Sequence, residues 1–137
     1  MKTPESYKFL GIDIGTTSLK AAVFDGAGKR LAVRSVDYTL DTDAETGFIE
    51  FNADQYIVMC RRVIAELEAE CGKIDALSVD TQGETLILTD KEGKPLCPAV
   101  VWLDNRAVAE AEAIKEKFGN KLVYDVPAEI VPEEPAE

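Results

Sequence analysis

A short segment near the N-terminus, GIDIGTTSLK at residues 11–20, has the pattern of a β-hairpin that binds phosphate. Before the turn, apolar residues alternate with glycine and aspartate, so one face of this strand suits a core and the other carries bare backbone and a carboxylate. The apolar residues of this strand are Leu10, Ile12 and Ile14. We therefore expect a buried strand that delivers Asp13 and the following turn to an exposed site.

The turn itself supplies groups that bind an anion. Gly15 permits a change of direction where a side chain would clash, and Thr16 and Thr17 offer hydroxyl and backbone N–H groups to a phosphate. Asp13 would repel a phosphate, so it is better suited to hold Mg²⁺ or its water ligands, and Lys20 could add a positive charge. The alternative is an ordinary hairpin with a Gly-Thr turn and an exposed aspartate. Neither GxxxxGK[ST] nor GxGxxG occurs in the sequence, so a P-loop and a dinucleotide-binding turn are not supported.

The composition limits the classes of function. A chain of 137 residues suits one domain with a substantial core, and 46% hydrophobic with 30% charged residues is typical of a soluble globular protein. The formal net charge of −11 disfavours partners such as nucleic acid or an anionic membrane, because a field of that sign repels phosphate groups. A phosphate site must then be built locally, from backbone N–H groups, a metal ion and a few lysines.

The chain has no histidine and three cysteines without CxxC spacing, which excludes His-based zinc sites and catalysis by Ser-His-Asp or Cys-His groups. The odd number of cysteines and the polar N-terminus lead us to expect a reduced, cytoplasmic protein. No apolar run reaches the roughly 20 residues that are needed to span a membrane.

A third strand is predicted at residues 30–38, after a tight turn. Alternation places Leu31 and Val33 on one face of this strand and Arg34 and Tyr38 on the other, wet face. Three antiparallel strands joined by short turns would form a meander.

Residues 39–51 have the character of an acidic loop, and an amphipathic helix follows them. Asn52 and Gln55 form a capping box at the start of this helix, and Gly72 ends it. The residues expected to face the sheet recur at helical spacing. They are Ile57, Cys60, Ile64, Leu67 and Cys71.

The second half of the sequence predicts further strands and a helix. A strand is expected at residues 74–79, followed by polar residues at the position where open α/β sheets bind ligands. A short strand is expected at residues 85–89, and a second helix at about residues 105–118, capped by Asp104 or Asn105.

After residue 126 the chain becomes rich in proline and glutamate, so residues 127–137 are predicted to form an extended or disordered tail. The order of the elements before this tail predicts an α/β domain of the ribonuclease-H-like type, with three antiparallel strands and parallel strands beside them.

Three segments together resemble the FGGY family of carbohydrate kinases, which includes glycerol kinases and xylulokinases. They are GIDIGTTSLK at residues 11–20, DTQGET at residues 80–85 and GKPLCPAVVWLDNRA at residues 93–107. The first segment is similar to the first phosphate motif of the actin, hexokinase and sugar-kinase superfamily. The resemblance extends in register from about residue 9 to residue 132, and three ordered motifs are more specific than one. It implies two ribonuclease-H-like domains that face a cleft and transfer the γ-phosphoryl group of ATP to a sugar or polyol with Mg²⁺.

The resemblance implies roles for the residues of the first motif. Asp13 would organise Mg²⁺ and the phosphates of ATP. Gly15, Thr16 and Thr17 would line the path of the phosphates, with Lys20 as a further cofactor-binding residue.

The other two motifs would contact the sugar. Gln82 precedes the dipeptide Gly83-Glu84, which is Arg-Glu in glycerol kinases and Met-His in xylulokinases. Glu84 can accept hydrogen bonds from vicinal hydroxyl groups, which retains a polyol as substrate, while the missing Arg disfavours glycerol and the missing His departs from xylulokinases. Asp104 and Arg106 match a W-x-D-x-R stretch near the sugar pocket, and the alternative for this pair is a helix N-cap beside an exposed arginine.

Other parts of the family pattern match nothing in the sequence. The catalytic aspartate, the second phosphate motif and the adenosine pocket of the family are located downstream in longer chains. Asp80 is a tempting substitute base, although one carboxylate at a strand end more often serves as a structural hydrogen-bonding group. The resemblance therefore implies that residues 1–126 form a partial N-terminal kinase domain, as a truncated piece, a shortened gene product or a processed fragment.

Two functions from different classes remain. The first is ATP-dependent phosphorylation of a sugar or polyol hydroxyl, to which this chain contributes an N-terminal fragment that is inactive alone. The second is a non-catalytic binding or oligomerising module that retains the kinase fold. Apolar surface left exposed by an incomplete domain would favour a homo-oligomer.

Overall fold

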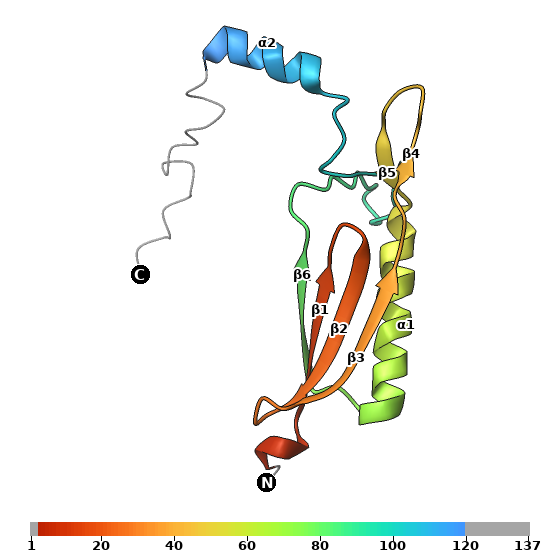
Figure 1. Cartoon of the computed structure of the whole chain (residues 1–137), viewed down its shortest axis with the longest axis vertical. Helices are drawn as coiled ribbons and strands as arrows, with labels where there is room; N and C mark the ends of the chain where they lie inside the picture. The colour runs from red at the N-terminus through yellow and green to blue at the C-terminus, as the bar shows by residue number, and fades with distance from the viewer. Residues whose placement is uncertain (1–2, 120–137) are drawn as a thin grey trace. The chain divides into compact units, whose positions relative to one another are not determined.

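The computed structural model describes residues 3–119, and its main feature is a mixed β-sheet with one long helix on one face (Figure 1). The sheet has the order β3-β2-β1-β6. Its strands are β1 (Lys8–Ile14), β2 (Ser18–Asp25), β3 (Arg30–Asp37) and β6 (Ala76–Thr81). β1 is antiparallel to β2, β2 is antiparallel to β3, and β1 is parallel to β6. The predicted meander with a parallel strand beside it is therefore confirmed.

The remaining elements are short, apart from the helices. They are the 3₁₀ turn η1 (Pro4–Ser6), the strands β4 (Asp41–Thr42), β5 (Ile49–Phe51) and β7 (Ala99–Val100), and the helices α1 (Ala53–Cys71) and α2 (Val108–Phe118). β4, β5 and β7 form a small second sheet. One compact unit ends at Asp104, and a second begins at Asn105 and contains α2.

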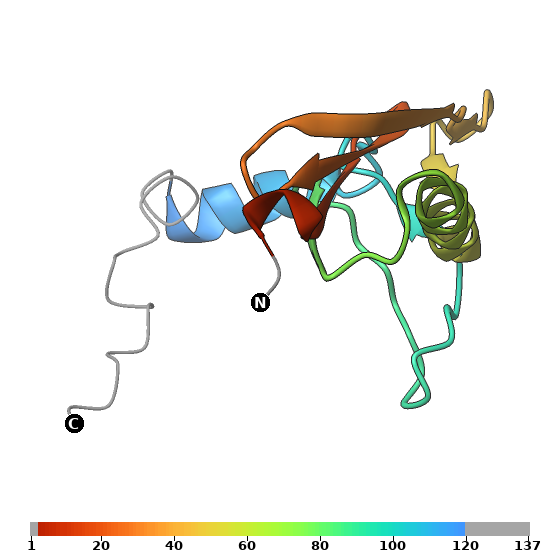
Figure 2. The same cartoon turned by 90° about the horizontal axis from the view of Figure 1, so that it is seen from below.

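The core is located between α1 and one face of the main sheet, as the view in Figure 2 along α1 shows. The alternation predicted for β1 is confirmed and β2 has the same pattern, because the residues of both strands that face α1 are at most 3% exposed. These residues are Leu10, Ile12, Leu19, Ala21 and Val23. Asp13 and Lys20 belong to the opposite phase of the two strands, so their side chains are on the face that α1 does not cover.

The predicted faces of β3 are wrong. Val33 is 51% exposed, whereas Ala32 is buried and the Arg34 side chain reaches α1, where it pairs with Glu70. The register of β2 and β3 shifts at this end of the strand pair, which leaves Leu31 as an additional residue in β3. Such a β-bulge reverses the alternation that follows it, so every residue after Leu31 is on the face opposite to the one predicted.

The ends of α1 are confirmed, and its predicted buried face is partly wrong. Asn52 caps the helix, but its side chain accepts a hydrogen bond of 3.0 Å from the Asp54 amide instead of pairing with Gln55, so the predicted capping box is wrong in its partner. Gly72, at φ 86°, ends the helix. Ile57 is 56% exposed. The buried residues form a stripe displaced toward neighbouring positions: Ala53, Tyr56, Met59, Val63 and Leu67. Cys60, Ile64 and Cys71 border this stripe and are partly buried.

Three further predictions of strands and loops are also corrected. Residues 39–51 contain β4 and β5 as well as a loop; strands of two and three residues are too short to leave a pattern in the sequence. Residues 85–89 form no strand, but two isolated bridges, Leu86 to Val100 and Thr89 to Pro95. The predicted strand at residues 74–79 begins and ends two residues later, as β6.

The second helix begins later than predicted. Ala107 precedes the first residue of α2, so neither Asp104 nor Asn105 caps it, and none of the residues of α2 is buried. The tail at residues 127–137 is outside the part of the chain that the structure describes. Among residues 3–119, no helix is long and apolar enough to cross a membrane.

Candidate functional site

The three segments singled out in the sequence converge on one depression of about 400 Å³. Its lining residues are Thr16 from the turn after β1, Gln82, Gly83 and Glu84 from the segment after β6, and Trp102 from the segment after β7. Parallel strands end at the same edge of a sheet, so the pairing of β1 with β6 explains why the first two segments meet. The Trp102 indole N–H donates to the Thr16 hydroxyl oxygen over 3.1 Å, which joins residues 86 positions apart.

The turn between β1 and β2 is tightly closed. The Gly15 N–H donates to the Ser18 carbonyl over 3.0 Å, and a Cβ on Gly15 would lie 3.3 Å from the same oxygen. The residue after β3 holds the turn from outside: the Tyr38 N–H donates to the Thr17 carbonyl over 3.0 Å, and the Tyr38 hydroxyl donates to the Gly15 carbonyl. Tyr38 thus holds the turn in place through the carbonyl groups of Gly15 and Thr17.

Tyr38 belongs to an aromatic cluster under the site. Its ring centroid is 4.7 Å from that of Phe51 and 5.9 Å from that of Tyr56. Burial, assisted by the adjacent Tyr56, raises the pKa of Tyr38, and burial also raises the pKa of Tyr56. Both hydroxyl groups therefore remain protonated at neutral pH, and Tyr38 remains a hydrogen-bond donor to the turn.

Gln82 anchors the second segment to this cluster. Its backbone N–H donates to the Ile14 carbonyl over 2.9 Å, and its side-chain Nε2 donates to the Tyr56 hydroxyl oxygen over 3.3 Å. Its Oε1 atom and the Oγ1 atom of Thr85 are buried without a hydrogen-bond partner among residues 3–119, and both residues line a cavity of about 170 Å³. Buried polar atoms are normally paired, so this cavity suits water or a ligand hydroxyl group.

Glu84 has an unusual backbone conformation. Its φ of 62° makes it the one non-glycine residue with positive φ in the described part of the chain. A side chain in this region costs on the order of 1 kcal/mol, and such strain is concentrated at functional sites. Glu84, the residue with this strained backbone, lines the same depression as Thr16 and Trp102.

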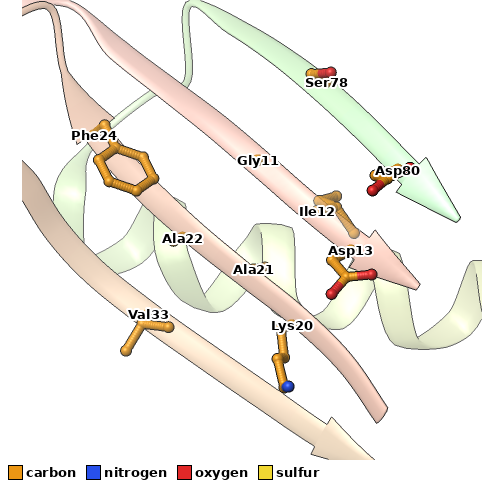
Figure 3. Close-up of a pocket in the computed structure, with 10 residues that line it drawn as sticks. All are labelled: Gly11, Ile12, Asp13, Lys20, Ala21, Ala22, Phe24, Val33, Ser78 and Asp80. Carbon is orange, nitrogen blue, oxygen red and sulfur yellow. The ribbon is translucent and has the colours of Figure 1, made fainter. Parts of the chain in front are cut away.

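Asp13 and Lys20 are located on the open face of the sheet, in a shallow depression of about 310 Å³ (Figure 3). In the strand register, Asp13 pairs with Lys20 on one side and with Asp80 on the other. Asp80 accepts a hydrogen bond of 3.0 Å from the Thr81 N–H, so it has a local structural role.

A magnesium ion at Asp13 would need ligands from outside the protein. Within residues 3–119, no group of three or more His, Cys, Asp or Glu residues is arranged to hold a metal ion. Mg²⁺ commonly uses one or two carboxylates and completes its octahedron with water and phosphate oxygens. The Asp13 carboxylate fits that mode of binding.

The third motif is divided between the two compact units. The Asp104 carboxylate accepts a hydrogen bond of 2.6 Å from the Ile49 N–H, which ties the segment after β7 to β5. Arg106 belongs to the second unit, which begins at Asn105.

Sequence reasoning missed three residues of the site. Trp102 occurs in the quoted W-x-D-x-R motif, so the motif itself could have drawn attention to it. Tyr38 and Tyr56 carry no such signal, because each occupies an ordinary position of a strand end or a helix in the sequence pattern.

Comparisons with known proteins agree with this arrangement. Residues 8–131 match the family model described as "FGGY family of carbohydrate kinases, N-terminal domain". The chain is 30% identical to xylulose kinase of Lactococcus lactis and 32% identical to glycerol kinase of Alcanivorax borkumensis, over 83% and 79% of its own length. It covers 23% and 22% of those two proteins.

The fold is also similar to solved structures. The ligand-bound xylulose kinase of Lactobacillus acidophilus superposes with a TM-score of 0.78 at 27% identity, over 86% of this chain and 24% of that one. This likeness confirms the predicted ribonuclease-H-like α/β fold as a partial domain. The chain thus spans about a quarter of the length of these relatives, and it belongs to the FGGY family of carbohydrate kinases.

Proposed function

We propose that this chain is part of a cytoplasmic kinase that transfers the γ-phosphoryl group of ATP to a hydroxyl group of a sugar or polyol. The observation that supports this most directly is the depression in which Thr16, the segment 82–84 and Trp102 meet. It brings a turn suited to phosphate next to a carboxylate suited to hydroxyl groups. Because the chain spans about a quarter of the length of these relatives, we expect it alone to bind nucleotide weakly and to have no turnover.

The phosphate side of the site would be formed by the turn after β1. Gly15 keeps the turn tight, and the N–H and hydroxyl groups of Thr16 and Thr17 would bind phosphate oxygens, with Lys20 adding positive charge. Asp13 would hold Mg²⁺ through one carboxylate and its water ligands. When bound, Mg²⁺ neutralises charge that develops on the transferred phosphoryl group.

The acceptor side would be formed by Gly83 and Glu84. Relatives of the chain are named xylulose kinase, glycerol kinase and gluconate kinase, so we infer a polyhydroxylated acceptor. A Cβ placed on Gly83 meets no atom within 4 Å, which leaves space where glycerol kinases carry an arginine. We therefore propose an acceptor larger than glycerol, held through hydrogen bonds from its hydroxyl groups to Glu84 and Gln82.

In the complete protein, Glu84→Gln should raise the KM for the acceptor by about tenfold, because a carboxylate accepts stronger hydrogen bonds from hydroxyl groups than an amide does. The KM for ATP should stay within about twofold, since the phosphates bind elsewhere. The measurement is ATP consumption with a panel of pentoses, pentuloses and polyols. A panel without any active acceptor would contradict the kinase, and an unchanged KM would remove Glu84 from the acceptor site.

The alternative, an oligomerising module, is supported by apolar surface beside the core. β6 pairs with β1 along one edge only among the described strands, and Leu77 and Val79 of β6 are 53% and 49% exposed. The open face of the sheet adds Phe9 and Phe24, at 42% and 37%. An unpaired edge next to apolar residues favours association.

We expect the 137-residue chain to self-associate, and Leu77→Lys to shift the equilibrium toward monomer. Sedimentation velocity at several concentrations measures this. A monomer at every concentration, with no ligand-dependent change in Tm, would contradict the oligomerising module.

A further inference from the structure

The hydrogen bond between Trp102 and Thr16 connects the two halves of the proposed site. Trp102 lines the same depression as Glu84, and its indole N–H donates to the hydroxyl of the phosphate turn over 3.1 Å. Trp102 is 48% exposed, so the bond is not explained by burial of an indole that needs a partner. A role other than the pairing of a buried donor must therefore account for this contact.

The rest of the turn has little freedom left. Tyr38 holds the carbonyl groups of Gly15 and Thr17, and the Gly15 N–H closes the turn on Ser18. The backbone is thereby fixed, and the part of Thr16 that can still rotate is its side chain. The bond from Trp102 fixes that side chain.

The direction of this bond determines what the hydroxyl can do next. An indole N–H can only donate, whereas a threonine hydroxyl has one donor and two acceptor lone pairs. Trp102 therefore occupies an acceptor lone pair of Thr16 and leaves its O–H to donate. Phosphate oxygens are acceptors, so the hydroxyl is left in the state that a phosphate requires.

We propose that Trp102 is a positioning residue that orients the Thr16 hydroxyl as a donor to a phosphate oxygen. This inference rests on the proposed function, namely that the turn after β1 binds phosphate. Because Trp102 also lines the acceptor side, it links the placement of the acceptor to that of the phosphate. It acts through Thr16 and touches neither reacting phosphate nor metal.

The hydrogen bond can be tested first without any ligand. The chain contains a single tryptophan, so its ¹H–¹⁵N NMR spectrum has one indole resonance. Thr16→Val should move this resonance and speed its exchange with water, whereas Thr16→Ser, which retains the hydroxyl, should restore both. An indole resonance identical in all three proteins would contradict the proposal.

The second test is titration with magnesium pyrophosphate, followed through the amide resonances of residues 15–18. Trp102→Phe keeps a ring but removes the donor, so it should weaken binding about three- to tenfold, the usual value of one hydrogen bond. Thr16→Val should weaken it at least as much. The double variant should bind no more weakly than Thr16→Val alone, because Trp102 acts through that hydroxyl. Thr42→Val, an exposed change in β4, is the control and should bind as the unaltered chain does.

The outcomes separate the two proposals. If pyrophosphate leaves the amides of the unaltered chain unmoved, the phosphate turn is wrong and the positioning role falls with it. If those amides move but Trp102→Phe binds equally well, or if the two single changes add fully in the double variant, only the positioning role is wrong.

Discussion

Asp13→Asn in the complete kinase should lower kcat by about a hundredfold or more and change the free energy of unfolding by less than about 1 kcal/mol. The carboxylate is at the end of β1 on the face that α1 does not cover, so the change removes no core contact. It removes the charge that would hold Mg²⁺ against the phosphates, an interaction that matters most as charge develops in transfer.

Asp80→Asn is the matched control for this change. Asp80 pairs in register with Asp13 and lines the same depression, but its carboxylate accepts a hydrogen bond from the adjacent Thr81 N–H. We expect kcat to fall less than tenfold in this variant. Steady-state kinetics and thermal unfolding of both variants give the comparison. An unchanged turnover number for Asp13→Asn would contradict its assignment to the metal.

The convergence of the motifs was largely predictable from the sequence. Alternation in β1 places Asp13 opposite the core, and the parallel pairing that brings residues 82–84 beside Thr16 follows from the order of strand and helix. The contacts between side chains were not predictable. The bond from Trp102 to Thr16 joins residues 86 positions apart, and no local pattern encodes such a pair.

The error in β3 shows how one residue can defeat a periodic pattern. The prediction assumes unbroken alternation from Arg30 onward, but the bulge at Leu31 inverts it, which exposes Val33 and turns Arg34 to α1. The predictions for the shorter segments are wrong for a different reason. Residues 85–89 make two bridges instead of a strand, and two- or three-residue strands have too few residues for a period to emerge.

The buried face predicted for α1 is displaced from the face that the structure buries. Several hydrophobic residues of this helix are exposed, among them Ile57 and Val58, so the hydrophobic positions do not by themselves define one stripe. The sheet selects the face that includes Val63 and Leu67, both at 0% exposure. Tertiary packing therefore decides between faces that the sequence leaves nearly equal.

That choice of face predicts a large difference between two similar substitutions. Leu67→Ala should lower the free energy of unfolding by about 2–5 kcal/mol, since it removes a buried side chain and leaves a cavity between α1 and the sheet. Ile57→Ala removes a similar volume from the same helix, but its side chain is 56% exposed, so the expected loss is within about 0.5 kcal/mol. Urea unfolding followed by circular dichroism measures both. Equal losses in the two variants would mean that α1 also buries Ile57, and the face assigned to the helix would be wrong.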